Sequence, residues 1–323
     1  MRNTILALLL LPTLLLVGAI AAADPIPVIY DTDIGGDIDD TWALAFLLKC
    51  PELDLQMIVT DSSNATYRAK VAAKMLEAAG RTDIPIGIGL HIGENTNDGQ
   101  APWVKDYDLA QYPGTLHQDG VGAMIKHIMN AEEPITLICV GPVPNIAKAL
   151  QREPRIAQKA KFVGMHGSVR KGYGGAPTPA KEANVRHYTQ ECQQALSAPW
   201  DITITPLDTC GLVALDGENY AKIRNAQSPL LKALLENYAI WRKNTGWFKD
   251  SPEYDHKSST LFDTVAVYLA FTRKHLTMEQ LPIRVTDDGY TIIDPAAKKM
   301  DVATEWKDLD AFEDLLTERL LNP

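Results

Sequence analysis

Short apolar segments alternate with helix-like segments along the first two thirds of the chain. The apolar segments have the length and composition of buried strands. They cover residues 26–30, 53–60, 84–88, 134–140, 161–165 and 202–207. Between them, residues 40–49, residues 66–79 and a segment ending at Leu150 have apolar side chains at helical spacing. Because strands that alternate with helices build βαβ units, we predict an α/β fold with an open, mostly parallel sheet flanked by helices, similar to a Rossmann fold.

The C-terminal third continues with helical patterns at residues 229–244 and 260–272. Near the end of the chain, five apolar side chains fall on one helical face, which we expect to dock on the core. They are Trp306, Leu309, Phe312, Leu316 and Leu320. Residues 89–120 and 167–179 are rich in Gly and Pro and predict long loops that border a binding site. No repeat or linker interrupts the pattern, so residues 24–323 are predicted to form one domain.

The first 23 residues differ from the rest of the chain. Arg2 supplies a positive charge, residues 5–20 are almost entirely apolar, and residues 21–23 are alanines that offer a cleavage site. This order is typical of a secretory signal peptide, so we expect a secreted or periplasmic protein. Without cleavage the segment would act as a membrane anchor instead. The remaining sequence has no apolar run long enough to span a bilayer.

The composition is that of a globular protein, with 46% hydrophobic and 22% charged residues and a formal net charge of −10. An acidic surface repels nucleic acids and anionic membranes, so we expect a small molecule as the partner. The four cysteines are scattered and form no C-x-x-C pair, which argues against a zinc site. Cys139 lies within an apolar run, where a buried thiol is expected, and we predict no disulfide framework.

Five carboxylates lie within ten residues, directly after the first apolar segment. They are Asp31, Asp33, Asp37, Asp39 and Asp40. In open α/β sheets, ligands bind beyond the carboxyl ends of the strands, which is where these acids fall. Asp31 and Asp33 are expected to point to one face while the strand continues. Asp39 and Asp40 are expected to begin a helix, whose dipole favours carboxylates at this end.

Carboxylates at this density repel each other, and a bound cation relieves the repulsion. Because the ligands are all oxygens, Ca²⁺ or Mg²⁺ is favoured over zinc or copper. The segment is not an EF-hand loop starting at Asp31, because Gly35 and Trp42 occupy the fifth and twelfth positions of such a loop. The sequence also lacks a G-x-x-x-x-G-K-[ST] phosphate-binding loop.

Further motifs follow the acidic cluster in a fixed order. They are Ser63-Asn64-Ala65-Thr66, Gly141-Pro142-Val143-Pro144-Asn145-Ile146-Ala147, Glu182-Ala183-Asn184-Val185, Leu207-Asp208 and Phe262-Asp263-Thr264-Val265-Ala266. Together with the acidic segment, they make the chain resemble the inosine/uridine-preferring nucleoside hydrolase family over most of residues 26–320. The family signature is Asp-x-Asp-x-Gly-x-Asp-Asp, and the spacer here is about two residues longer. We pair its last two acids with Asp39 and Asp40, and Asp37 remains a rival for one of these roles.

The resemblance implies a Ca²⁺-dependent hydrolase that cleaves the N-glycosidic bond of ribonucleosides or related N-ribosides. The ligands of the Ca²⁺ would be Asp33, Asp40, Asp263 and the backbone carbonyl of Val140, a set of hard oxygen donors. Asp33 would also be the catalytic base that takes the proton of the attacking water. The ribose hydroxyls would be bound by four further side chains. These are Asp39, Asn64, Glu182 and Asn184.

One position departs from the family pattern. Many members have a His before the final Asp, which protonates the leaving base, whereas this chain has Phe262. His256 is a candidate substitute, and Trp241, Trp247 and Tyr254 are candidates to stack on a base, although core packing is the expected role of these aromatic side chains. The base specificity is therefore open.

Two other functions remain open from the sequence. Asp31 and Asp33 after a strand also fit a phosphatase with an Asp-x-Asp nucleophile, although no later Lys and acidic pair can be assigned to it. The replacement by Phe262 also fits a non-catalytic, Ca²⁺-dependent binder of sugars or nucleosides. A homo-oligomer is suggested by the resemblance alone.

Overall fold

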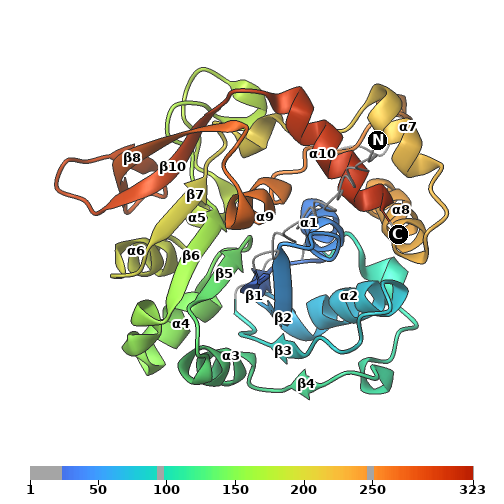
Figure 1. Cartoon of the computed structure of the whole chain (residues 1–323), viewed down its shortest axis with the longest axis horizontal. Helices are drawn as coiled ribbons and strands as arrows, with labels where there is room; N and C mark the ends of the chain where they lie inside the picture. Colours follow the sequence, from blue (N-terminus) through green and yellow to red (C-terminus); the bar gives the residue numbers. More distant parts are fainter. Residues whose placement is uncertain (1–23, 93–97, 246–250, 323) are drawn as a thin grey trace, which may run out of the picture.

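The computed structural model describes residues 24–92, 98–245 and 251–322, so the predicted signal peptide at residues 1–23 lies outside the described part. In that part, ten strands form one sheet, and helices cover both of its faces (Figure 1). The strands are β1 (Ile26–Thr32), β2 (Leu53–Thr60), β3 (Ile86–Ile88), β4 (Leu116–His117), β5 (Ile135–Cys139), β6 (Ala160–Met165), β7 (Ile202–Thr205), β8 (Leu276–Val285), β9 (Thr291–Ile293) and β10 (Lys299–Trp306). The α-helices are α1 (Asp39–Leu47), α2 (Ala65–Ala78), α3 (Gly120–Asn130), α4 (Pro144–Arg152), α5 (Ala183–His187), α6 (Thr189–Ser197), α7 (Gly217–Arg224), α8 (Pro229–Asn244), α9 (Thr264–Phe271) and α10 (Leu309–Leu321). The predicted α/β class with a mostly parallel sheet is confirmed.

The order of the strands places one topological switch point at the centre of the sheet. The order is β4–β3–β2–β1–β5–β6–β7–β10–β8–β9, and the pairs are parallel from β4 to β10. From β1 the chain moves outward to β2, and from the neighbouring strand β5 it moves outward in the other direction to β6. In open α/β sheets the crevice beyond the carboxyl ends of two such strands is the usual ligand site.

The alternation of side chains along β1 divides the core into two parts. Val28 and Tyr30 point to the face covered by α1, α2, α8, α9 and α10, whereas Ile29 points to the face covered by α3, α4 and α6. This period of two is what a strand buried on both faces requires. The next side chains follow the same alternation, so Asp31 lies on the Ile29 side and Thr32 on the Tyr30 side.

The C-terminal third differs most from the sequence prediction. Strands β8, β9 and β10 form an antiparallel extension of the sheet, which the sequence pattern did not reveal (Figure 1). Trp306 ends β10 and was wrongly predicted to lie in the last helix. That helix starts at Leu309 because the Asp308 side chain accepts a hydrogen bond from the Ala311 amide and caps it. The Trp306 ring still packs on the helix, stacked at 4.8 Å from the Phe312 ring.

The structure also bears on three smaller predictions, which concern the cysteines, membrane-spanning helices and the long loops. All four cysteines are buried and free, as expected for packed thiols without a disulfide framework. Across residues 24–92, 98–245 and 251–322, no helix has the length and apolar character needed to cross a bilayer. The predicted loop at residues 89–120 contains two short 3₁₀ helices and β4, and the predicted loop at residues 167–179 contains one short 3₁₀ helix.

The packing of α10 against the core gives a prediction about stability. Phe312 is fully buried and contacts the rings of Phe46, Tyr268 and Trp306. We expect Phe312→Ala to lower the free energy of unfolding by about 3–5 kcal/mol, because it leaves a cavity among these rings. Leu321→Ala on the same helix is the control, since Leu321 is exposed and its truncation should cost less than about 0.5 kcal/mol. Urea denaturation of both variants measures the difference, and equal losses would contradict the assigned packing of α10.

Candidate active site

A cavity of about 620 Å³ lies beyond the carboxyl ends of β1, β5 and β6, at the switch point of the sheet. The turn after β1, the starts of α1, α5 and α9, and the segment after β6 form its walls. All but one of the predicted site residues line this cavity. They are Asp33, Asp39, Asp40, Val140, Glu182, Asn184 and Asp263. Segments more than 200 residues apart in sequence therefore converge on one site.

Three buried carboxylates form the deepest part of the cavity. Carboxylate oxygens of Asp39, Asp40 and Asp263 lie within 4.8 Å of one another, and the three residues are at most 5% exposed. Burial, followed by repulsion from neighbouring carboxylates, raises the pKa of each of the three well above its usual value. Asp263 occupies the N-cap position of α9, but its side chain makes no capping hydrogen bond. This oxygen-only cluster could hold a hard metal ion, which would remove the repulsion.

The composition of this cluster differs from the predicted ligand set in one residue. Asp39, predicted to bind ribose, belongs to the cluster, whereas Asp33 lies in the same cavity outside the closest group. The side chain of Asp33 is 25% exposed, and one oxygen lies 3.9 Å from Nη2 of Arg68. A residue that is open to the cavity and next to the buried acids can reach both a cation and a substrate water.

Asp31 and Asp33 do not share a face, contrary to the expectation from their spacing. Strand β1 ends at Thr32, so the chain turns before Asp33. Asp31 is fully buried below the cavity and accepts a hydrogen bond of 2.8 Å from Nδ2 of Asn145. The Thr32 hydroxyl points the other way and donates to Asp40 at 2.5 Å. Asp31 therefore supports the turn and does not line the cavity.

The turn between β1 and α1 is held in place from both sides. Gly35 has φ 107°, a conformation that side chains rarely adopt. Its carbonyl accepts a hydrogen bond from the Tyr67 hydroxyl at 2.9 Å, and the carbonyl of Gly36 accepts one from Nε1 of Trp241 at 3.1 Å. Asp37 accepts from the Ile38 amide at 2.6 Å. Asp37 also lines the cavity, but Asp39 and Asp40, and not Asp37, form the cluster with Asp263. The geometry therefore favours Asp39 and Asp40 as the last two acids of the signature.

A second polar wall comes from the start of α5. Glu182 is 2% exposed and accepts hydrogen bonds from the amides of Gly167, Asn184 and Val185. Burial outweighs these three bonds and raises the pKa of Glu182 to about 7. Nδ2 of Asn184 donates to the carbonyl of Val140 at 2.7 Å. A carbonyl oxygen has two lone pairs, so that of Val140 keeps one for a further ligand.

Three residues considered for the site lie elsewhere. Asn64 is exposed, and its Oδ1 accepts a hydrogen bond of 3.0 Å from the Tyr67 amide, so it caps α2 outside the cavity lining. His256 is also exposed and lies 3.4 Å from Nη1 of Arg224, away from the cavity. Trp241 packs in the core against Tyr238. Trp247 lies outside the described residues.

Several residues of the site were missed by the sequence analysis. Arg68 and Asp61 are buried beneath the turn, and Tyr173 lines the cavity next to Phe262. His166 is fully buried and contacts the carbonyl of Gly141 at 3.1 Å, and burial lowers its pKa to about 4. Asp61 directly follows β2, so its place at a strand end was the available signal. Arg68 and Tyr173 lie in a helix and a loop and give no comparable signal.

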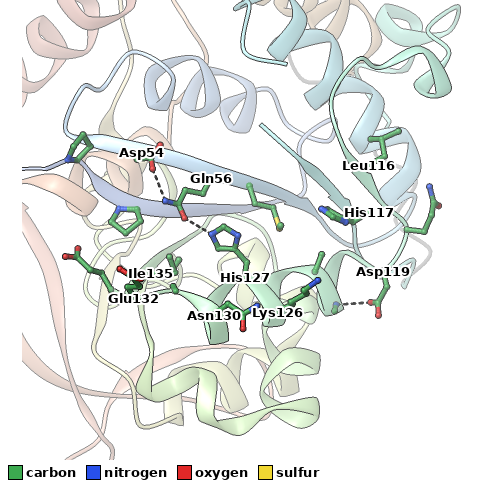
Figure 2. A pocket seen from close by; sticks show the side chains of 18 residues that line it. Asp54, Gln56, Leu116, His117, Asp119, Lys126, His127, Asn130, Glu132 and Ile135 are labelled. Carbon is green, nitrogen blue, oxygen red and sulfur yellow. Dashed lines mark hydrogen bonds between the residues drawn. The ribbon is translucent and has the colours of Figure 1, made fainter. Parts of the chain in front are cut away.

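A larger groove of about 910 Å³ lies at the other end of the sheet (Figure 2). It runs between the amino end of β2 and the helix α3, and Gln56 links Asp54 to His127 through hydrogen bonds of 2.8 and 2.6 Å. Among the described residues, the acidic cluster suited to a metal lies in the cavity at the carboxyl ends of the strands, not here. The smaller cavity is therefore the better candidate for an active site.

Comparison with known proteins identifies the family of this chain. The sequence profile of the inosine-uridine preferring nucleoside hydrolase family matches residues 28–314. A pyrimidine-specific ribonucleoside hydrolase, RihA of Photobacterium profundum, is 30% identical over 251 residues, which cover 71% of this chain and 77% of RihA. A probable uridine nucleosidase 2 of Arabidopsis thaliana is 24% identical and covers 89% of this chain and 92% of its own length.

Solved structures of nucleoside hydrolases share the fold. A plant nucleoside hydrolase, PpNRh1, superimposes with a TM-score of 0.75 at 23% identity and covers 93% of this chain and 100% of its own. A purine-preferring ribonucleoside hydrolase from Gardnerella vaginalis gives a TM-score of 0.74 at 20% identity over 91% of this chain and 98% of its own. Since the family profile extends from β1 into α10, this chain belongs to the inosine-uridine preferring nucleoside hydrolases, a family of N-glycosyl hydrolases.

Proposed function

We propose that this protein is an exported, Ca²⁺-dependent enzyme that hydrolyses the N-glycosidic bond of ribonucleosides or close relatives and releases ribose and the free base. The observation that carries the proposal is the buried cluster of Asp39, Asp40 and Asp263, which opens beside Asp33 into a cavity of about 620 Å³. A cavity of this size is in the range for small-molecule sites. Membership of this family argues against the alternative of a phosphatase with an Asp-x-Asp nucleophile.

The donor set favours Ca²⁺ as the metal. Carboxylates of Asp33, Asp39, Asp40 and Asp263 and the carbonyl of Val140 offer only oxygens, and a set of this size suits a cation that takes six to eight of them. When bound, Ca²⁺ would neutralise the crowded acids and make a coordinated water more acidic.

The side chains of the chain itself supply the other roles. Asp33 is partly open to the cavity and accepts the proton of the water that attacks the anomeric carbon. Asp39, Glu182 and Asn184 line the same cavity and hold the ribose hydroxyls, which fixes the sugar for an oxocarbenium-like transition state. Asn64 has the role of a helix cap in this proposal.

The export of the protein rests on the sequence of residues 1–23. The related enzymes named above differ in their stated preference for pyrimidines, uridine or purines, so their names do not select one base. At the rim of the cavity, Tyr173 and Phe262 place two aromatic rings 6.0 Å apart, which is a suitable wall for a planar base.

Replacement of the proposed base tests the reaction directly. We expect the wild-type protein with Ca²⁺ to release ribose from at least one of a panel of ribonucleosides, and Asp33→Asn to lower kcat/KM at least about 100-fold, because the attacking water loses its proton acceptor. Asp54→Asn, at the remote groove, is the control and should keep full activity. Product chromatography measures both. Binding of nucleosides without turnover by the wild type would favour the non-catalytic alternative.

The raised pKa values predict how Ca²⁺ affects stability at different pH. Without metal, burial raises the pKa of Asp37 to about 6 and that of Glu182 to about 7, above the ordinary values of these groups. The folded state therefore binds more protons than the unfolded state between about pH 4 and 7, and the chelated protein should lose stability as the pH rises through this window.

Added Ca²⁺ should offset this loss, because the carboxylates of Asp33, Asp39, Asp40 and Asp263 bind it in their ionised form. We expect the gain in Tm from Ca²⁺ to be larger at pH 8 than at pH 5, with a stabilisation of about 2.7 kcal/mol when Ca²⁺ is at 100 times its Kd. Asp263→Asn should remove most of the gain at pH 8. Thermal melts with Ca²⁺, Mg²⁺ and chelator measure the effect, and equal gains at both pH values would argue against a carboxylate site.

The role of Asn64 gives a separate prediction. If Asn64 caps α2, Asn64→Ala should cost about 1 kcal/mol of stability and leave KM and kcat unchanged. Asn64→Asp, which keeps the capping oxygen, should restore the stability. Denaturation curves and steady-state kinetics on the same preparations separate the two roles, and a rise in KM without loss of stability would support a contact with ribose instead.

A further inference from the structure

The proposed reaction requires a proton donor for the departing base, and the residue before Asp263 cannot supply it because it is Phe262. We infer that the hydroxyl of Tyr173 is this donor. The inference rests on the proposed function and deepens it, since it names a catalytic residue at the base end of the same cavity.

The hydroxyl of Tyr173 is held in position while its proton stays available. Its oxygen accepts a hydrogen bond of 2.9 Å from the amide of Ala183, so the acceptor side of the group is occupied. Within the described part of the chain, no acceptor is assigned to the hydroxyl proton. The side chain lines the cavity and is 44% exposed, so a ligand can reach it. A hydroxyl with an occupied acceptor side and an unused proton is oriented to donate to a ligand.

Two neighbours connect this side chain to the segments that carry the metal cluster and the sugar wall. The ring of Tyr173 meets the ring of Phe262 edge to face, at 6.0 Å and 83°, and Phe262 directly precedes Asp263. Ala183, which binds the hydroxyl, lies between Glu182 and Asn184. Gly174 and Gly175 follow Tyr173 with φ of 61° and 78°, and this sharp turn lets the side chain project into the cavity.

The imidazole of His187 and the hydroxyls of Ser259 and Thr260 also line the cavity and fit this role less well. His187 is exposed, its Nε2 lies 3.1 Å from Nη2 of Arg186, and burial of part of the ring lowers its pKa, so it is neutral. The hydroxyls of Ser259 and Thr260 are aliphatic and much weaker acids than a phenol. Burial and the nearby Glu182 raise the pKa of Tyr173, so its hydroxyl carries its proton at neutral pH.

The step balances with one water consumed. The C1′–N bond breaks, its electron pair moves into the base, and the Tyr173 hydroxyl gives its proton to a basic atom of that base. Water adds its hydroxyl to C1′ and its proton to Asp33. Asp33 then releases a proton to solvent, and Tyr173 takes one back from solvent. The net products are ribose and the neutral base.

Comparison of two substrates with different leaving groups tests the inference. A nucleoside base leaves poorly without a proton, whereas p-nitrophenolate leaves from p-nitrophenyl riboside without one. We expect Tyr173→Phe to lower kcat/KM for the best nucleoside about 100-fold and to leave that for p-nitrophenyl riboside unchanged. Tyr188→Phe is the matched control, because the Tyr188 hydroxyl bonds to the carbonyl of Ile92 outside the cavity lining and its removal should affect neither substrate.

The outcomes separate this inference from the proposed function. Equal losses on both substrates would mean that Tyr173 binds the sugar or supports the fold, and no loss on the nucleoside would mean that it is not the donor; both results overturn the inference alone. A selective loss in His187→Gln, with Tyr173→Phe unaffected, would transfer the role to His187 and also overturn it. A wild-type protein that cleaves neither substrate would overturn the proposed function and the inference with it.

Discussion

The repulsion among buried carboxylates at the centre of the sheet is the constraint on which the site depends. Asp39, Asp40 and Asp263 are nearly inaccessible to solvent, and burial and their mutual repulsion raise the pKa of each. An isolated ionised group in such a place costs several kcal/mol or more. The fold keeps these acids together because three rigid structures, the end of β1 and the starts of α1 and α9, position them. A bound cation would offset the free-energy cost of burying these ionised groups, so the cluster is suited to hold one.

The remaining residues around the acids can be understood as responses to this constraint. Arg68 is 1% exposed and supplies a fixed positive charge beneath Asp33, and it also donates to the carbonyls of Ile34 and Ser62. Ser62 has φ 53°, a left-handed conformation that costs about 1–3 kcal/mol for a residue with a side chain. The buried guanidinium therefore joins the ends of β1 and β2 and stabilises a turn that would be unfavourable alone.

Two further buried acids lie below the cavity and have a structural role. Asp31 and Asp61 are fully buried, and burial raises the pKa of each of them. The pKa of Asp31 rises to about 7, and Asn145 donates to one of its oxygens. Asp31 therefore helps to join β1, β2 and α4, whereas Asp33, two residues later, lies in the cavity. The same residue type has two roles because the strand ends between them.

The sequence predicted the features that local patterns mark, and it missed the features that depend on tertiary contacts. Alternating apolar segments predicted β1 to β3 and β5 to β7 but missed the two-residue strand β4. The acids after β1 predicted the position of the cavity, because a strand end is a local signal. Asp263 was predicted by the resemblance to the family. Strands β8 to β10 are half exposed and lack a continuous apolar run, so periodicity did not reveal them. Arg68 and Tyr173 act through tertiary contacts across more than 30 and 80 residues, and no local pattern marks such residues.

The cavity has two chemically different ends, and this asymmetry connects the fold to the reaction. At its deep end, the carboxylates at the starts of α1 and α9 are suited to bind a cation by charge, and the packed core fixes their geometry. At its rim, Tyr173 and Phe262 lie on the segments before α5 and α9, where glycines and polar residues tolerate substitution more readily than the core does. A sugar bound by the deep end would present its base to the rim. The choice of base can therefore change through the rim residues while the carboxylates that act on the sugar stay fixed.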